Sequence, residues 1–171
     1  MALVATLLGL AGTAQAQCDW TDGMDSRAPR NDPGRGISDW TQHQAYASSN
    51  ERSAATVPDL IAARFDALRA CSSAQVYAQL YADASVLIAH YGRAHAAWVD
   101  AMDARAPSDD PGRGVAAHGA HREYASGAAA ANVSRLVRRR LSDLRAALPP
   151  AMFARLYADV SILLANYARM R

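Results

Sequence analysis

Residues 80–87 read LYADASVL and residues 156–163 read LYADVSIL, so one pattern returns after 76 positions. A second pair of segments repeats as clearly. Residues 20–36 read WTDGMDSRAPRNDPGRG, and residues 98–114 read WVDAMDARAPSDDPGRG, 78 positions later. Self-similarity at a fixed period indicates a duplicated structural unit. The sequence therefore predicts two tandem copies of a unit of roughly 75 residues.

Apolar residues recur with the period of an α-helix between the repeated loops. In one segment they are Val76, Leu80, Leu87, Tyr91, Trp98 and Met102. Residues 73–104 contain no Pro, so we expect one long helix that joins the two copies. The same period predicts helices over residues 57–70 and 133–148, and Pro149 and Pro150 should separate the last two helices.

These patterns predict an all-α fold, a helical bundle with pseudo-twofold symmetry. Copy 1 would occupy residues 17–95 and copy 2 residues 96–171, packed together as one domain. Hydrophobic residues make up 51% of the chain, and all 18 basic residues are Arg. Together with abundant Ala, this composition excludes a disordered or collagen-like chain and favours helices.

The first 16 residues, 1–16, have the pattern of an export signal. An apolar run over residues 3–10 is followed by Ala-Gln-Ala at residues 14–16, which is an A-x-A cleavage site. We expect the mature chain to begin at Gln17 and to reside in the bacterial periplasm or outside the cell. No later apolar run approaches the length of about 18 residues that a transmembrane helix needs, so no membrane span is expected.

The two cysteines of the chain are Cys18 and Cys71. An even number of cysteines in an exported chain favours a disulfide, here within copy 1. In the chain-entropy model such a bond would contribute about 3–4 kcal/mol. No C-x-x-C-H motif for haem attachment is present, and we predict no cofactor.

The repeated loops allow two interpretations. Asp followed by Pro is typical of a helix N-terminus, so Asp32 and Asp110 are structural caps in one interpretation. In the other, Arg and backbone N–H groups at a helix start bind an anionic ligand. The candidate ligand-binding residues are Arg27, Asp32, Arg35, Arg105, Asp110 and Arg113. The spacing of the neighbouring carboxylates matches no EF-hand, and we predict no metal site there.

Arg64 and Arg140 each fall in the middle of an apolar helix face. A buried charge requires a partner or access to water. Asp83 and Asp159 lie at the edge of the apolar stripe of the following helix, so we predict the buried ion pairs Arg64–Asp83 and Arg140–Asp159. Alternatively, each arginine lines a pocket and binds an anionic ligand.

The histidines give a weaker signal. His118 and His121 have the i, i+3 spacing that can place two imidazoles on one metal ion. Copy 1 has Trp40 and His43 at these positions, and no third ligand is evident. We therefore predict no metal site, and we expect His43 and His121 at the surface or boundary of their helices.

A basic face on one helix belongs to copy 2 alone. It consists of Arg135, Arg138 and Arg139, where copy 1 has Asp59, Ala62 and Ala63. Such a face is either solvated or a surface for an acidic protein or an anionic membrane. The small net charge of +2 and the absence of known nucleic-acid-binding motifs argue against a nucleic-acid partner.

No nucleophile–base motif, P-loop or zinc-protease motif is present, so the sequence argues against an enzyme. We expect an exported, non-enzymatic α-helical binding protein with a protein partner, such as an inhibitor or immunity-type partner of a secreted protein. Two alternatives stay open. One is a helical bundle that binds a small ligand or a metal, and the other is a periplasmic hydrolase that uses the repeated aspartates.

Overall fold

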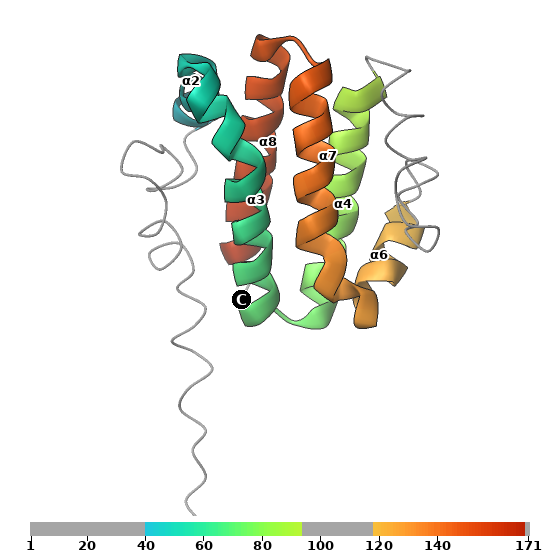
Figure 1. The fold of residues 1–171 in the computed structure, drawn as a ribbon. Helices are drawn as coiled ribbons and strands as arrows, with labels where there is room; N and C mark the ends of the chain where they lie inside the picture. Colours follow the sequence, from blue (N-terminus) through green and yellow to red (C-terminus); the bar gives the residue numbers. More distant parts are fainter. Residues whose placement is uncertain (1–39, 94–117, 170–171) are drawn as a thin grey trace, which may run out of the picture.

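The computed structural model describes residues 40–93 and 118–169, and every element in these two ranges is helical (Figure 1). The elements of the first range, here called the first half, are α2 (Trp40–Ser49), α3 (Glu51–Cys71) and α4 (Ala74–Arg93). Those of the second half are α6 (His118–Ser126), the 3₁₀-helix η4 (Ala128–Asn132), α7 (Val133–Ala147) and α8 (Pro150–Arg169). The predicted all-α class is confirmed. None of the described helices is both long and apolar enough to cross a membrane.

The helix boundaries follow local signals. α7 ends at Ala147 and α8 begins at Pro150, so the two prolines separate these helices as predicted. α3 begins at Glu51, earlier than the apolar period indicated, because the side chain of Asn50 accepts a hydrogen bond of 2.9 Å from the backbone N–H of Ser53. α4 forms the first part of the predicted joining helix, and residues 94–104 lie outside the described ranges.

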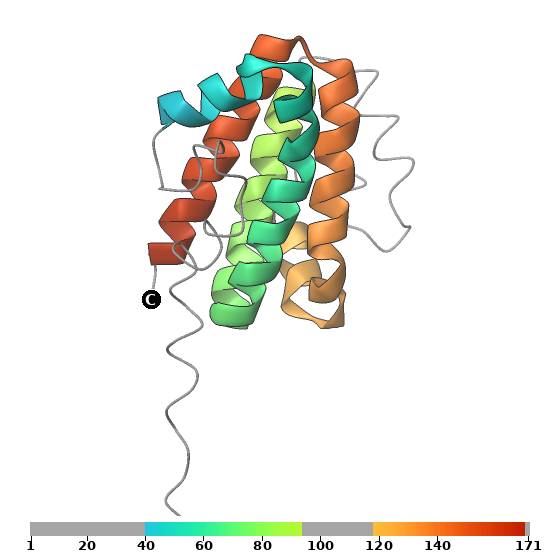
Figure 2. The ribbon, with the colours of Figure 1, turned by 60° about the vertical axis from the view of Figure 1, so that its left-hand side comes forward.

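Four long helices, α3, α4, α7 and α8, form a bundle, as Figures 1 and 2 show from two directions. α3 packs mainly against α7, and α4 packs more against α8 than against α3, the helix that precedes it in the chain. The short helices follow the same rule, since α2 lies on α8 and α6 lies on α4. Each half therefore buries its apolar surface against the other half.

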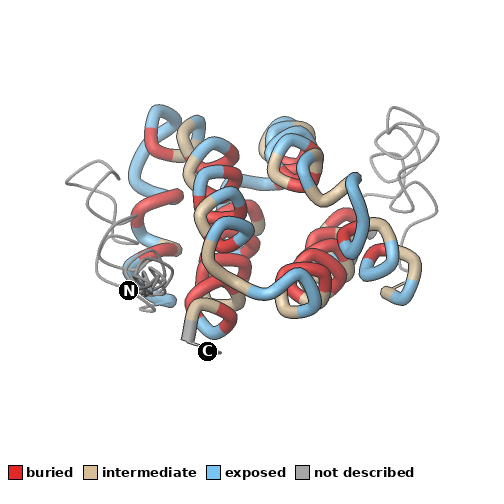
Figure 3. The backbone as a smooth tube through the Cα atoms, turned by 90° about the horizontal axis from the view of Figure 1, so that it is seen from below, coloured by how far each residue is buried: buried red, intermediate tan, exposed pale blue. Residues whose placement is uncertain are grey.

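The core of the bundle is continuous between the halves. Buried residues recur along each of the long helices, as the burial colours on the backbone show when the bundle is seen from below (Figure 3). Fully buried members of the single apolar cluster include Phe65, Leu80, Leu141 and Leu156, each at most 1% exposed. The described parts of both halves thus share one core, whereas the predicted boundary between the copies at residues 95 and 96 lies outside the described ranges.

Candidate functional site

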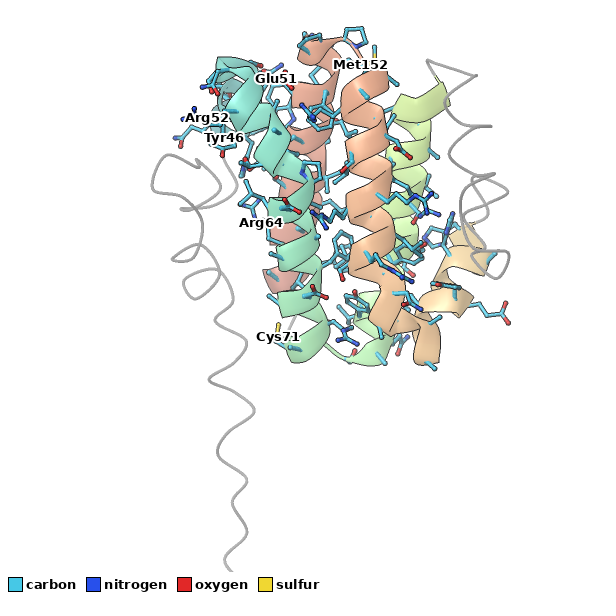
Figure 4. All side chains as sticks on the ribbon, viewed as in Figure 1. Tyr46, Glu51, Arg52, Arg64, Cys71 and Met152 are labelled. Atoms are coloured by element: carbon cyan, nitrogen blue, oxygen red, sulfur yellow. The ribbon has the colours of Figure 1, made fainter. Side chains whose placement is uncertain are left out.

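The side chains of two buried arginines make hydrogen bonds with the opposite half of the bundle. Arg64, midway along α3 (Figure 4), is 4% exposed, and its Nη1 lies 3.4 Å from both Tyr157 Oη and Ser161 Oγ on α8. Arg140 on α7 is 6% exposed and donates a hydrogen bond of 3.0 Å to Tyr81 Oη on α4. The burial of both arginines is confirmed, and both contact a tyrosine of the opposite half.

Two histidines pack against the same tyrosines. The ring of His43 meets Tyr157 edge-on at 5.3 Å between centroids, and the ring of His121 meets Tyr81 in the same geometry at 5.4 Å. Both histidines are only 2% exposed, so their predicted placement at the surface or boundary is wrong. They are buried because α2 and α6 turn these rings toward the opposite half.

These contacts form two matching groups of side chains. The first polar cluster contains His43, Tyr46, Arg64, Tyr157 and Ser161, and the second contains His121, Tyr124, Arg140, Tyr81 and Ser85. Each member lies 76 or 78 positions from its counterpart. They differ at the serine, because the buried Oγ of Ser85 makes no hydrogen bond with a described residue, whereas Ser161 contacts Arg64.

The predicted pairing of Arg64 with Asp83 is wrong, because the structure gives this aspartate other partners. Asp83 Oδ1 accepts hydrogen bonds from His118 Nε2 at 2.7 Å and from Gln79 Nε2 at 3.1 Å. Asp83 Oδ2 accepts one from the hydroxyl of Tyr167. The carboxylate lies half-buried at the edge of the bundle, where it meets α6 and α8, whereas the arginine points into the interior.

The same correction holds for Arg140 and Asp159. Asp159 Oδ1 accepts a hydrogen bond of 2.6 Å from Trp40 Nε1, and Oδ2 accepts one from the hydroxyl of Tyr91. Trp40 and Tyr91 belong to the first half and Asp159 to the second. Each aspartate is thus held by one residue from a short helix and one tyrosine from a long helix of the opposite half. We call these two arrangements the aspartate clamps.

The tyrosines of the clamps are protonated donors. Burial, followed by the hydrogen bond to Asp159, raises the pKa of Tyr91 well above its ordinary value. Burial and the hydrogen bond to Asp83 raise the pKa of Tyr167 in the same way. A phenol with a raised pKa stays neutral and donates to the ionised carboxylate. These clamps therefore act as hydrogen-bonded connections between the halves.

The exposed face of α7 carries the predicted arginines. Arg138 pairs with Asp59 on α3, and the two side chains are 59% and 62% exposed. Arg135 donates a hydrogen bond of 3.1 Å to the side chain of Asn132. Arg139 is exposed and contacts no hydrogen-bond or ion-pair partner among the described residues. A further pair joins Arg145 to Glu51, which lies at the upper end of α3 in Figure 4.

Several predicted site residues lie outside the described ranges and stay predictions. They are Cys18, Arg27, Asp32, Arg35, Arg105, Asp110 and Arg113. Cys71 is half-buried at the lower end of α3 (Figure 4), and its disulfide with Cys18 is likewise still a prediction. Within residues 40–93 and 118–169, no three His, Cys, Asp or Glu side chains come together as a metal site.

The tyrosines were missed by the sequence argument although a signal for them exists. Tyr81 and Tyr157 recur at the 76-residue offset, and so do Tyr91 and Tyr167. A polar group that recurs on the buried face of both copies must find a partner. The partners predicted for the arginines are charged residues of the same copy, whereas the observed partners Tyr81 and Tyr157 are neutral and lie in the other half.

No protein-family model, curated protein or solved structure matches this chain. Function is therefore inferred from the residues described above. Chemically, both polar clusters and both aspartate clamps make hydrogen bonds between the halves. Of the exposed arginines of α7, Arg138 pairs with Asp59 of the first half, whereas Arg135 contacts Asn132 of its own half and Arg139 contacts no hydrogen-bond or ion-pair partner among the described residues.

Proposed function

We propose that this chain is an exported, non-enzymatic α-helical protein that acts by binding another protein. One observation carries the proposal. The buried polar contacts occur twice, once in each half, whereas the exposed arginine face of α7 occurs once. We define this face as Arg135, Arg138 and Arg139.

Contacts that occur in both halves and a face that occurs in only one half are expected to have different roles. In a chain built from a repeat, contacts that stabilise the fold are needed in both copies, because each copy presents the same surface to the other. A charged face that only one copy has is not part of that duplicated packing, and its one pair with the opposite half among the described residues, Arg138 with Asp59, is exposed. Exposed charges contribute little to stability, so an arginine-rich face is available for recognition.

The export part of the proposal is supported by the apolar run and Ala-Gln-Ala site within residues 1–16. The non-enzymatic part is supported by the use of the two clamp aspartates. The carboxylates of Asp83 and of Asp159 each accept hydrogen bonds from the opposite half. This arrangement favours a structural role over acid–base chemistry.

Site-specific photo-cross-linking in bacteria tests this proposal. The chain has no Lys, so amine-reactive reagents would label little beyond the N-terminus. A photoreactive amino acid is introduced at Ser142, an exposed position on α7 beside the arginine face. The matched control carries it at Ala63, an exposed position of α3 that corresponds to Arg139 of α7.

We expect a discrete protein adduct from position 142 in the exported fraction and little from position 63. Mass spectrometry of the adduct would identify the partner. If neither position yields an adduct, and the remaining exposed positions of α2, α4, α6 and α8 yield none either, the proposed function is wrong. An adduct from another helix would keep the binding function but move it away from α7.

A further inference from the structure

We infer that the arginine face of α7 binds one acidic helical segment of a protein partner, with carboxylates one turn apart, and that each chain has one such site. This inference rests on the proposed binding function and adds the chemistry, geometry and stoichiometry of the partner. Arg138 and Arg139 follow Arg135 by three and four positions, which places each of them about 5–6 Å from Arg135 on the helix surface.

This spacing matches the carboxylates of an acidic helix. Glu or Asp residues three and four positions apart on a partner helix have the same separation as the arginines. A guanidinium binds a carboxylate through two parallel hydrogen bonds, and such bonds are stronger than those between neutral groups. An acidic helix laid along α7 could therefore place one carboxylate on each arginine.

The arginines can exchange their present contacts at little cost. Arg139 has no ionic partner among the described residues, and Arg135 contacts the neutral side chain of Asn132. The pair between Arg138 and Asp59 is more than half exposed on both sides. Exposed pairs of this kind contribute at most about 1 kcal/mol, so a partner carboxylate can replace Asp59.

The sequence difference between the halves limits the site to one per chain. At the positions of α3 that correspond to the arginine face, the first half has Asp59, Ala62 and Ala63. One of these side chains is acidic and the other two are short. These positions therefore offer no guanidinium to a partner carboxylate, although the rest of the fold is duplicated.

The burial pattern of α7 favours a protein over a membrane. The apolar residues Val133, Leu136, Val137, Leu141 and Leu144 are all at most 5% exposed. Helices that bind a membrane surface insert apolar side chains beside their basic residues. Trp40 is the exposed large apolar residue of the described ranges, and it lies on α2, where it holds Asp159.

The test is a titration of the full mature chain with a synthetic acidic helix. The probe is a peptide of about 15 residues with Glu at every fourth position and Ala or Gln elsewhere. A second peptide of equal composition has its Glu residues at every second position. Isothermal titration calorimetry gives the affinity and the stoichiometry.

We expect one peptide per chain, weaker binding at high salt, and a preference for the first peptide. The double variant Arg135→Ala/Arg139→Ala should bind at least about tenfold more weakly. The matched control is Arg52→Ala/Arg69→Ala, which removes two exposed arginines from α3 and should change binding less than about twofold.

Three results would overturn the inference. They are equal loss of binding in both double variants, a stoichiometry of two, or binding to phosphatidylglycerol vesicles that depends on Arg135 and Arg139 while neither peptide binds. This inference can fail while the proposed binding function holds. A cross-linked protein partner on another face would leave the binding function standing and remove only the arginine face.

Discussion

At the scale of single residues, the aspartate clamps make the most direct prediction. In Asp159→Asn the neutral amide is a weaker acceptor for Trp40 Nε1 and the Tyr91 hydroxyl, so the free energy of unfolding should fall by about 1–3 kcal/mol. The pKa of Tyr91 should also fall toward its ordinary value, because one cause of its increase is removed. Urea unfolding and the ultraviolet absorbance of tyrosinate measure the two effects.

Asp59→Asn is the control for this change. Asp59 is exposed, and its pair with Arg138 is screened by solvent, so stability should change by less than roughly 0.5–1 kcal/mol. If Asp159→Asn left both the stability and the titration of Tyr91 unaltered, the clamp would not exist in solution.

Tyr77 gives a prediction of the opposite sign. Its hydroxyl is buried and has no hydrogen-bond partner in the described ranges, and the corresponding residue of the second half is Phe153. Tyr77→Phe should therefore stabilise the fold by about 1 kcal/mol. Tyr81→Phe should destabilise it by about 1–3 kcal/mol, because Arg140 loses an acceptor. Chemical denaturation measures the stability of both variants. A loss of stability in Tyr77→Phe would show that the Tyr77 hydroxyl does have a hydrogen-bond partner.

The helical period correctly predicted the burial of residues in the middle of an apolar face, such as Arg64 and Arg140. Their partners were not predictable from the same signal. A helical period fixes which way a side chain points on its own helix, but the partner depends on which other helix lies opposite. His43 shows the same limit, since α2 is short and polar and only its packing on α8 buries the ring.

At the scale of helices, the two N-caps of the long central helices differ. Asn50 accepts a hydrogen bond from Ser53 N at the start of α3. Asn132 at the start of α7 caps no backbone N–H of its helix and instead accepts a hydrogen bond from the side chain of Arg135. Asn50→Ala should cost about 1 kcal/mol of unfolding free energy. Asn132→Ala should cost less than half of that, and thermal melts compare the two. Equal losses would show that the cap of α3 is not what fixes its first turn.

Helix α7 was predicted within one residue because its apolar period is clear, and the two prolines correctly marked the break between α7 and α8. The start of α3 was missed for a physical reason. Its first turn, from Glu51, holds polar and small residues that carry no apolar period, so the period alone places the start of the helix too late. The cap, rather than the period, determines where this helix begins.

At the scale of the whole molecule, the tyrosines predict instability at alkaline pH. Burial first, and neighbouring carboxylates second, raise the pKa of Tyr77, Tyr91 and Tyr167 in the folded chain. The unfolded chain then loses these protons at lower pH than the folded chain. Stability is therefore complete below about pH 10 and decreases as the pH rises above it.

The absence of Lys makes this effect easy to isolate, because no lysine titrates in the same range. We expect the urea midpoint to fall steadily between about pH 10 and pH 12. A midpoint that stays constant over this range would contradict the burial of the three phenols. Tyr91→Phe should reduce the slope, since one of the linked protons is then absent.

The repeat in the sequence predicted that two copies pack together, but it did not predict how. Similar copies can stack side by side with separate cores, or they can interlock. The choice depends on which faces meet, and the Tyr–Asp and Arg–Tyr contacts between halves become visible only when α2 lies on α8 and α6 on α4. The interlocked core is the central claim about this fold.

Hydrogen exchange of a core variant tests that claim most directly. Ile88→Val removes one methylene from α4 in the first half and should cost about 0.5–1.5 kcal/mol. If the halves share one core, the slowest amides of α7 and α8 will exchange faster by the same factor as those of α3 and α4. Faster exchange confined to α3 and α4, with α7 and α8 unchanged, would show that the halves are stable separately and would contradict the interlocked fold.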